Sequence, residues 1–144
     1  MKKIISKSFN HIKIHTQYSI CEGAVKIDEL KDFCKKKKIK SVGISDTSNL
    51  CGSLEFSENL SKAGTQPIIG TQIIFQDENE NYGLIPLISK NQKGYKRIIE
   101  LSSNSYLDNP DSLMPKCKFN DLFFETEGII VLSGGINGFF GNLF

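Results

Sequence analysis

The chain has 144 residues, of which 39% are hydrophobic and 24% are charged. This length suits one modest domain or part of a larger one, and a folded chain of this size buries about two thirds of its extended surface. A net charge of +2 is too small to predict a dedicated nucleic-acid-binding protein, because such proteins concentrate far more lysine and arginine. The apolar runs are shorter than the roughly 18 to 20 residues that a membrane span needs, so we expect a soluble, cytoplasmic protein with no membrane partner.

The cysteines show no metal-binding or disulfide pattern. Cys21, Cys34, Cys51 and Cys117 are widely and unevenly spaced, and no two of them form a C-x-x-C pair. This spacing matches neither a zinc ribbon nor a disulfide framework. We therefore expect reduced and mostly buried thiols.

Strand and helix patterns alternate along the chain. Residues 9–15 alternate like a strand, which places His11, Lys13 and His15 on one face. Apolar residues at spacings of three and four predict an amphipathic helix over 27–37. A second helix is predicted over 53–64, with Ser53 as its N-cap and Gly64 as its C-cap glycine. The remaining predictions are strands at 40–46, 66–75, 82–88 and 128–133, a helix at 91–107, and a loop at 108–118.

This alternation predicts an α/β fold with mostly parallel strands, either open or curled into a barrel. In both forms, ligands and catalytic groups gather at the carboxyl ends of the strands. The positions to consider are therefore 15–22, 45–50, Gln72 and 133–135.

Five segments together carry a resemblance to a known family. They are FNHIKIHTQYSICEGAVKIDEL, SVGISDTSNLCGSLEF, AGTQPIIGTQIIF, LIPLISKNQKGYKRIIELSSNSYL and EGIIVLSGG. In this order and spacing they resemble the N-terminal PHP (polymerase and histidinol phosphatase) domain of bacterial DNA polymerase III alpha subunits. The resemblance implies part of a PHP-type (β/α)7 barrel, with residues 1–144 as its N-terminal portion. The apolar end GFFGNLF is an unusual finish for a domain, so we expect an interrupted reading frame or a shortened chain.

The resemblance also implies where metal ligands stand in metal-competent members. Those positions fall here on Lys13, His15, Glu22, Thr47, Gln72, Gly83 and Gly135. His15 keeps the ligand type of the family and Glu22 keeps the charge. The glycines have no donor atom, and a lysine places positive charge where cations would sit. We therefore predict a decayed site with no bound metal, in which Lys13 pairs with Glu22 or with Asp46.

Several of these features also have a purely structural interpretation. His11 and His15 are typical of hydrogen-bonded structural histidines, and Asp46 is typical of a residue that orders a turn. The lysines at 35–38 most often form a solvated helix end, and nucleic-acid contact is the second interpretation. The glycines at 134–141 lack the pattern of a P-loop and predict a tight turn.

The function that the resemblance implies belongs to a replicative DNA polymerase. The whole protein would bind primer-template DNA, use Mg²⁺ in a polymerase palm, and assemble with a proofreading exonuclease subunit, a sliding clamp and other replicase subunits. This chain, which holds no palm residues, is expected to be an inactive structural and docking module without a cofactor. The alternative is a metal-dependent PHP phosphoesterase or 3′-5′ exonuclease.

Overall fold

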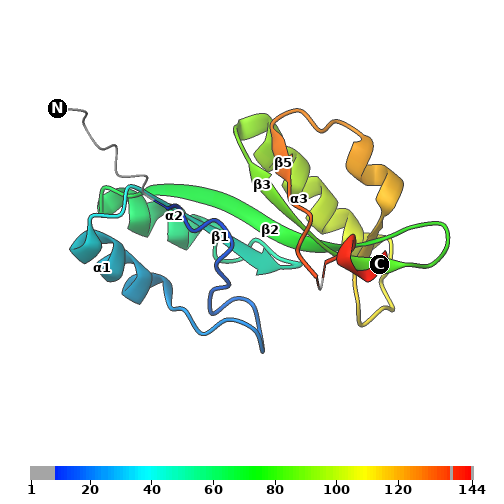
Figure 1. The fold of residues 1–144 in the computed structure, drawn as a ribbon, viewed down its shortest axis with the longest axis horizontal. Coiled ribbons are helices and arrows are strands. Elements are labelled where there is room, and N and C mark those ends of the chain that lie inside the picture. Colours follow the sequence, from blue (N-terminus) through cyan, green and yellow to red (C-terminus); the bar gives the residue numbers. More distant parts are fainter. Residues whose placement is uncertain (1–8, 137, 144) are drawn as a thin grey trace.

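A computed structural model describes residues 9–136 and 138–143 of the chain. Its α-helices are α1 (Ile27–Lys37), α2 (Ser53–Lys62) and α3 (Gln92–Leu107). Its strands are β1 (Ser41–Thr47), β2 (Gln66–Gln76), β3 (Tyr82–Ser89), β4 (Lys116–Lys118) and β5 (Ile129–Val131). Short 3-10 helices follow at Phe119–Phe123 (η1) and Gly141–Leu143 (η2). Helices and strands alternate, and the predicted α/β class is confirmed (Figure 1).

The strands form one sheet in the order β1-β2-β3-β5, and β4 also pairs with β2. The β1–β2 and β2–β4 pairs are parallel, whereas the β2–β3 and β3–β5 pairs are antiparallel. The sheet is therefore mixed, and the expectation of mostly parallel strands is corrected. The reason is the short link at 77–81, because a parallel connection needs a crossover of a dozen or more residues.

The link between β2 and β3 is ordered by Asp77. Its Oδ1 accepts hydrogen bonds from the backbone N–H groups of Asn79 and Asn81, both at 2.9 Å. The Asn81 side chain donates to Asp77 Oδ2 at 2.9 Å, and this bond is the main cause that lowers the pKa of the Asp77 carboxyl, with the two backbone bonds adding to it. The hairpin thus follows from ordinary turn chemistry.

The predicted strand at 9–15 is present only as a single bridge. Ile14 pairs in parallel with Ile44 of β1, and the Gly43 N–H donates to the His11 carbonyl at 2.7 Å. A ladder needs successive pairs of this kind, so the alternation of side chains did not by itself make a strand. The segment nevertheless runs beside β1 and delivers His15 to the carboxyl end of that strand.

Helix α1 forms as predicted, with Ile27, Leu30 and Cys34 buried on its inner face. The predicted N-cap of α2 is wrong, because Gly52 holds that position and Ser53 is the first helical residue. Gly64 lies just beyond the end of α2 with a φ of +74°, a conformation that glycine adopts with little strain.

Helix α3 begins at an N-cap that the sequence did not single out. The Asn91 side chain accepts a hydrogen bond from the Gly94 N–H at 3.0 Å. After α3, the expected loop at 108–118 ends in strand β4, which pairs with Ile74–Gln76 at the end of β2. The prediction of a loop over all of 108–118 is therefore wrong for its last three residues. They form a strand because the end of β2 pairs with them, and their own sequence shows no strand pattern.

Two hydrophobic cores lie at opposite ends of the long strand β2 (Figure 1). One core joins α1, β1 and α2, and the other joins α3, β2, β3 and η1. The carboxyl end of β1 lies beside the middle of β2, because Thr47 is paired with Gln72. The predicted site positions therefore lie near the junction of the two cores. Within the described residues, no helix is long and apolar enough to cross a membrane.

Candidate functional site

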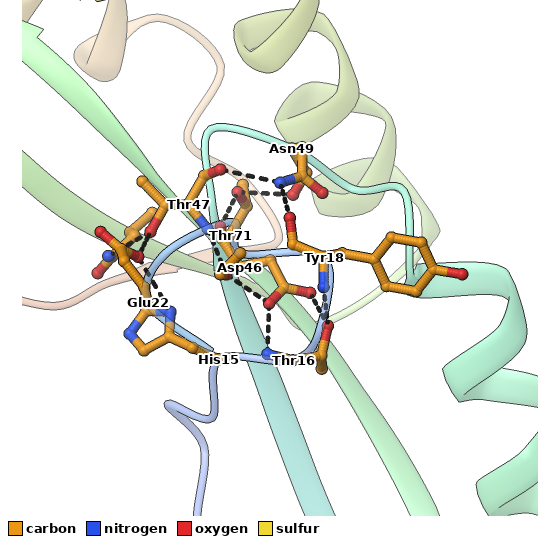
Figure 2. A network of polar contacts seen from close by, with 10 residues as sticks. His15, Thr16, Tyr18, Glu22, Asp46, Thr47, Asn49 and Thr71 are labelled. Atoms are coloured by element: carbon orange, nitrogen blue, oxygen red, sulfur yellow. Dashed lines mark hydrogen bonds and ion pairs between the residues drawn. The ribbon is translucent and has the colours of Figure 1, made fainter. Parts of the chain in front are cut away.

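Four of the implied ligand positions meet at the carboxyl end of β1. Gln72 Nε2 donates to Thr47 Oγ1 at 2.8 Å, and Thr47 Oγ1 donates to Glu22 Oε2. His15 Nδ1 lies 3.8 Å from the same Glu22 oxygen. Figure 2 shows His15, Glu22 and Thr47 gathered on one side of the strand end. We call His15, Glu22, Thr47 and Gln72 the Glu22 cluster.

The local backbone explains how the Glu22 cluster forms. Thr47 and Gln72 are register partners on parallel strands, so their side chains share a face of the sheet. His15 directly follows the bridge residue Ile14. Glu22 is carried by a tight turn in which the N–H groups of Glu22 and Gly23 both donate to the Ser19 carbonyl, at 3.0 and 2.9 Å.

Some polar atoms of the Glu22 cluster have no hydrogen-bond partner among the described residues. His15 Nδ1 and Gln72 Oε1 are buried and have no hydrogen-bond partner among the described residues. The 3.8 Å separation from Glu22 is too long for a hydrogen bond. The His15 and Glu22 side chains are 25% and 43% exposed, so water can reach this group.

Asp46 belongs to a second, fully buried network that adjoins the Glu22 cluster. Its carboxylate accepts from the Thr16 N–H at 2.6 Å, from Thr16 Oγ1 at 2.7 Å and from Ser19 Oγ at 2.6 Å. Ser19 Oγ in turn accepts from the Thr47 N–H at 3.1 Å. The residue is 2% exposed. We call Asp46, Thr16 and Ser19 the Asp46 network (Figure 2), and its geometry favours the structural interpretation of Asp46.

The turn after β1 is tied into the same region. Asn49 Nδ2 donates to the carbonyls of Tyr18 and Thr47, at 3.0 and 2.9 Å. Thr71 Oγ1 donates to the carbonyls of Asp46 and Asn49, at 2.6 and 3.0 Å. These contacts join the loop at 16–23, the end of β1 and the middle of β2 (Figure 2).

Tyr18 marks the outer edge of this region. Its hydroxyl donates to Glu55 Oε2 on α2 at 2.6 Å, and this bond raises the pKa of Tyr18. Thr16, Tyr18 and Ser19 lie within the predicted range 15–22, but none of them was predicted individually as a site residue. The only signal for them is a run of hydroxyl side chains directly after a predicted strand.

The remaining implied positions lie outside the Glu22 cluster. Lys13 is exposed and pairs with neither Glu22 nor Asp46, so the predicted ion pair is wrong. A Cβ atom on Gly83 would lie 2.5 Å from the Phe139 Cα, which shows that the backbone at 138–139 fills that space. Gly135 has a φ of +76° and open surroundings. His11 is exposed and packs edge-on against Phe9, with ring centroids 4.7 Å apart.

The residues present do not fit the metal cluster that the family resemblance implies. Within the described residues, no group of three or more His, Cys, Asp or Glu side chains is arranged to hold a metal ion. Catalytic zinc sites use three protein ligands, whereas the Glu22 cluster offers one imidazole and one carboxylate. Its other two members, Thr47 and Gln72, bring neutral oxygens that suit transition metals poorly.

The buried thiols do not supply the missing ligands. Burial raises the pKa of Cys117 to about 12, and it also raises the pKa of Cys34. Neither thiol belongs to the Glu22 cluster, because Cys34 is packed in the core of α1, β1 and α2 and Cys117 is packed in the core of α3, β2 and β3. Cys21 and Cys51 are exposed, so the expectation of mostly buried cysteines holds for two of the four.

Comparisons with known proteins show which family this chain matches. The PHP domain model matches residues 11–144. DNA polymerase III subunit alpha of Caulobacter vibrioides is 35% identical over 139 residues, which cover 92% of this chain and 12% of that protein. The same subunit of Aquifex aeolicus is 35% identical over 150 residues, which cover 93% and 13%. The chain thus spans about an eighth of the length of these relatives.

A solved structure shares the fold. It is a candidate metal-dependent phosphoesterase from Bifidobacterium adolescentis, with a TM-score of 0.52 and 16% sequence identity. The match covers 92% of this chain and 46% of that chain. At this level of identity the likeness concerns the fold alone.

Proposed function

Because the chain belongs to the PHP domain family, we propose that it forms the PHP domain of a replicative DNA polymerase alpha subunit and acts there as a non-catalytic scaffold. The supporting relatives are DNA polymerase III alpha subunits that match over nine tenths of this chain. In this role, the domain stabilises the polymerase and offers a surface to a proofreading exonuclease subunit.

One observation carries the non-catalytic part of the proposal. The Glu22 cluster retains only His15 and Glu22 as strong metal donors, and these two side chains lie 3.8 Å apart. Phosphoester hydrolysis by a metal site needs a bound cation that activates water or polarises the phosphoryl oxygen. Two donors beside a hydroxyl and an amide do not assemble such a site.

Space is a second obstacle to a working metal site. A side chain at position 83 would collide with the backbone of Phe139, whose Cα lies 2.5 Å from the place of a Cβ atom. Restoring a ligand there therefore requires the segment at 138–139 to move. A metal site is therefore opposed both by the residue types at the ligand positions and by the course of the backbone at 138–139.

The activity proposed for the whole protein lies elsewhere. Nucleotidyl transfer onto a primer-template, with Mg²⁺ at a polymerase palm, is the proposal for a protein of the kind that the relatives represent. Its proposed partners are the exonuclease subunit, the sliding clamp and other replicase subunits, and its proposed location is the cytoplasm. We propose no cofactor for the domain described here.

A nuclease assay tests the non-catalytic proposal against the phosphoesterase alternative. The purified chain is incubated with an end-labelled primer and added Mn²⁺ or Zn²⁺, and nucleotide release is measured. We expect no release above that of a buffer control. Release that disappears in His15→Ala and persists in His11→Ala would overturn the proposal, because His11 is exposed and lies outside the Glu22 cluster.

A further inference from the structure

A group of lysines covers the end of the molecule where α1 terminates. Lys35, Lys36 and Lys37 form the last turn of α1, Lys38 is its C-cap, and Lys40 precedes β1. All five are exposed. None forms an ion pair with an acidic side chain of residues 9–136 or 138–143. We call these five residues the lysine end.

The acidic residues of α1 lie in its first turn and its middle, and they are near lysines other than these five. Lys31 Nζ lies 3.1 Å from Asp28 and 4.0 Å from Asp32. Lys26 Nζ lies 4.0 Å from Glu29. Charge is therefore separated along the helix, and the positive part is left without a partner in the described chain.

Helix stability does not account for all of this charge. The carboxyl end of a helix carries only about half a negative charge, which lysines in the last turn offset. Five lysines exceed that need. Lys38 also has a φ of 52°, a left-handed conformation that glycine would adopt with less strain.

The lysines surround the helix end and do not form one outer stripe. The apolar stripe of α1 runs through Ile27, Leu30 and Cys34. At helical spacing the next position on that stripe is Lys37 or Lys38, and both are exposed. The last turn therefore presents ammonium groups in several directions, which suits a convex contact with an extended anion.

The lysine end lies away from the Glu22 cluster. The cluster forms at the carboxyl end of β1, whereas Lys40 lies just before its first residue, Ser41. Seven residues of strand separate the two ends by roughly 20 Å. The start of β2 lies beside this surface, because the Lys40 carbonyl accepts from the N–H of Gln66, the first residue of β2, at 2.8 Å. In Figure 1 this is the outer part of the α1 and α2 side of the molecule.

We propose that the lysine end binds the phosphate backbone of double-stranded DNA without reading its sequence. Duplex DNA presents a negative charge about every 1.7 Å along its axis, and several lysines can contact neighbouring phosphates at once. A membrane surface fits less well, because a helix that binds a bilayer inserts an apolar face. The apolar face of α1 is buried in the core, and Phe33 is the single large apolar side chain of α1 that is exposed.

Binding of the whole chain to a labelled random-sequence duplex tests this proposal by fluorescence anisotropy across about 50 to 200 mM salt. Each phosphate contact contributes about 0.9 to the slope of log affinity against log salt. We expect K35Q/K36Q/K37Q to reduce the magnitude of that slope by about 2 to 3 and to weaken binding about tenfold or more at the lower salt concentration. K38Q/K40Q leaves the helical residues of α1 unchanged and should reduce the slope by about 2.

The matched control is K13Q/K90Q/K96Q, which removes the same charge from exposed lysines elsewhere on the chain. It should keep a slope close to that of the unmodified chain. Circular dichroism melting shows whether each variant is folded. If K35Q/K36Q/K37Q is not folded, the binding of K38Q/K40Q decides the result. An equal loss in the control would overturn the proposal, as would no duplex binding, or binding to anionic lipid vesicles but not to DNA. Failure of this test leaves the metal-site proposal unaffected, because the two regions share no residue.

Discussion

The Asp46 network and the Glu22 cluster lie at the same strand end, but they differ in how fully their polar atoms are hydrogen-bonded. The Asp46 carboxylate is 2% exposed and accepts three hydrogen bonds of 2.6 to 2.7 Å. The Glu22 side chain is 43% exposed, accepts from Thr47, and has His15 at 3.8 Å. The fold therefore holds one carboxylate firmly and leaves the other with little support.

The difference indicates that Asp46, and not Glu22, stabilises the fold. Asp46 and Thr47 are neighbours in β1, so their side chains point to opposite faces of the sheet. On one face, hydroxyl and backbone donors stabilise a buried charge. On the other face, the buried His15 Nδ1 and Gln72 Oε1 lack partners among the described residues. This contrast supports the proposal that the domain holds no metal cluster.

The largest expected effect is that of Asp46→Ala. The substitution leaves the Thr16 N–H and two hydroxyl groups without their acceptor in a buried site, and hydrogen bonds to charged groups contribute about 1.5 to 3 kcal/mol each. We expect the free energy of unfolding to fall by about 3 kcal/mol, measured by urea denaturation. A loss below about 1 kcal/mol would show that the network is not structural.

The next largest effect is expected for Gly83→Ala. Its new Cβ atom would overlap the Phe139 backbone, which cannot move as freely as a side chain. We expect a loss of about 2 kcal/mol in the free energy of unfolding. Gly135→Ala is the control, since its Cβ atom meets nothing within 4 Å and only its positive φ is unfavourable, which should cost about 1 kcal/mol. The reverse order of the two losses would contradict the view that residues 138–139 fill the place of a lost ligand.

The smallest expected effect is that of Glu22→Ala. This side chain is nearly half exposed, and exposed pairs contribute at most about 1 kcal/mol. We expect the free energy of unfolding to change by less than about 0.5 kcal/mol, in the same urea measurement. A loss comparable with that of Asp46→Ala would remove the contrast between the two regions.

The parts of the fold that depend on local periodicity were predictable from the sequence. The buried positions of α1 repeat at three and four residues, and β1, β2, β3 and α3 lie close to their predicted bounds. Strand β4 was not predictable, because its three residues are defined by their pairing with Ile74–Gln76. The segment 9–15 shows the converse, since its alternation is that of a strand and its backbone makes only one bridge.

The candidate site was predictable in position and less so in detail. The rule that ligands gather at the carboxyl ends of strands gave the ranges 15–22 and 45–50 and Gln72. Within them, the family resemblance indicated His15, Glu22, Thr47 and Gln72, which lie together in the structure. The donors to Asp46 were missed, because no sequence spacing indicates that Thr16 and Ser19 fold back onto β1. The partner expected for Lys13 was wrong, because alternation assigns a face to a side chain but does not fix which charge it meets.

Metal stoichiometry tests the central claim most directly. The purified chain is incubated with excess Zn²⁺ or Mn²⁺, separated from free ions by gel filtration, and analysed by mass spectrometry for bound metal. The lack of a third strong donor beside His15 and Glu22 predicts far less than one metal ion per chain. One or more ions per chain, retained in His11→Ala and lost in His15→Ala, would contradict the account.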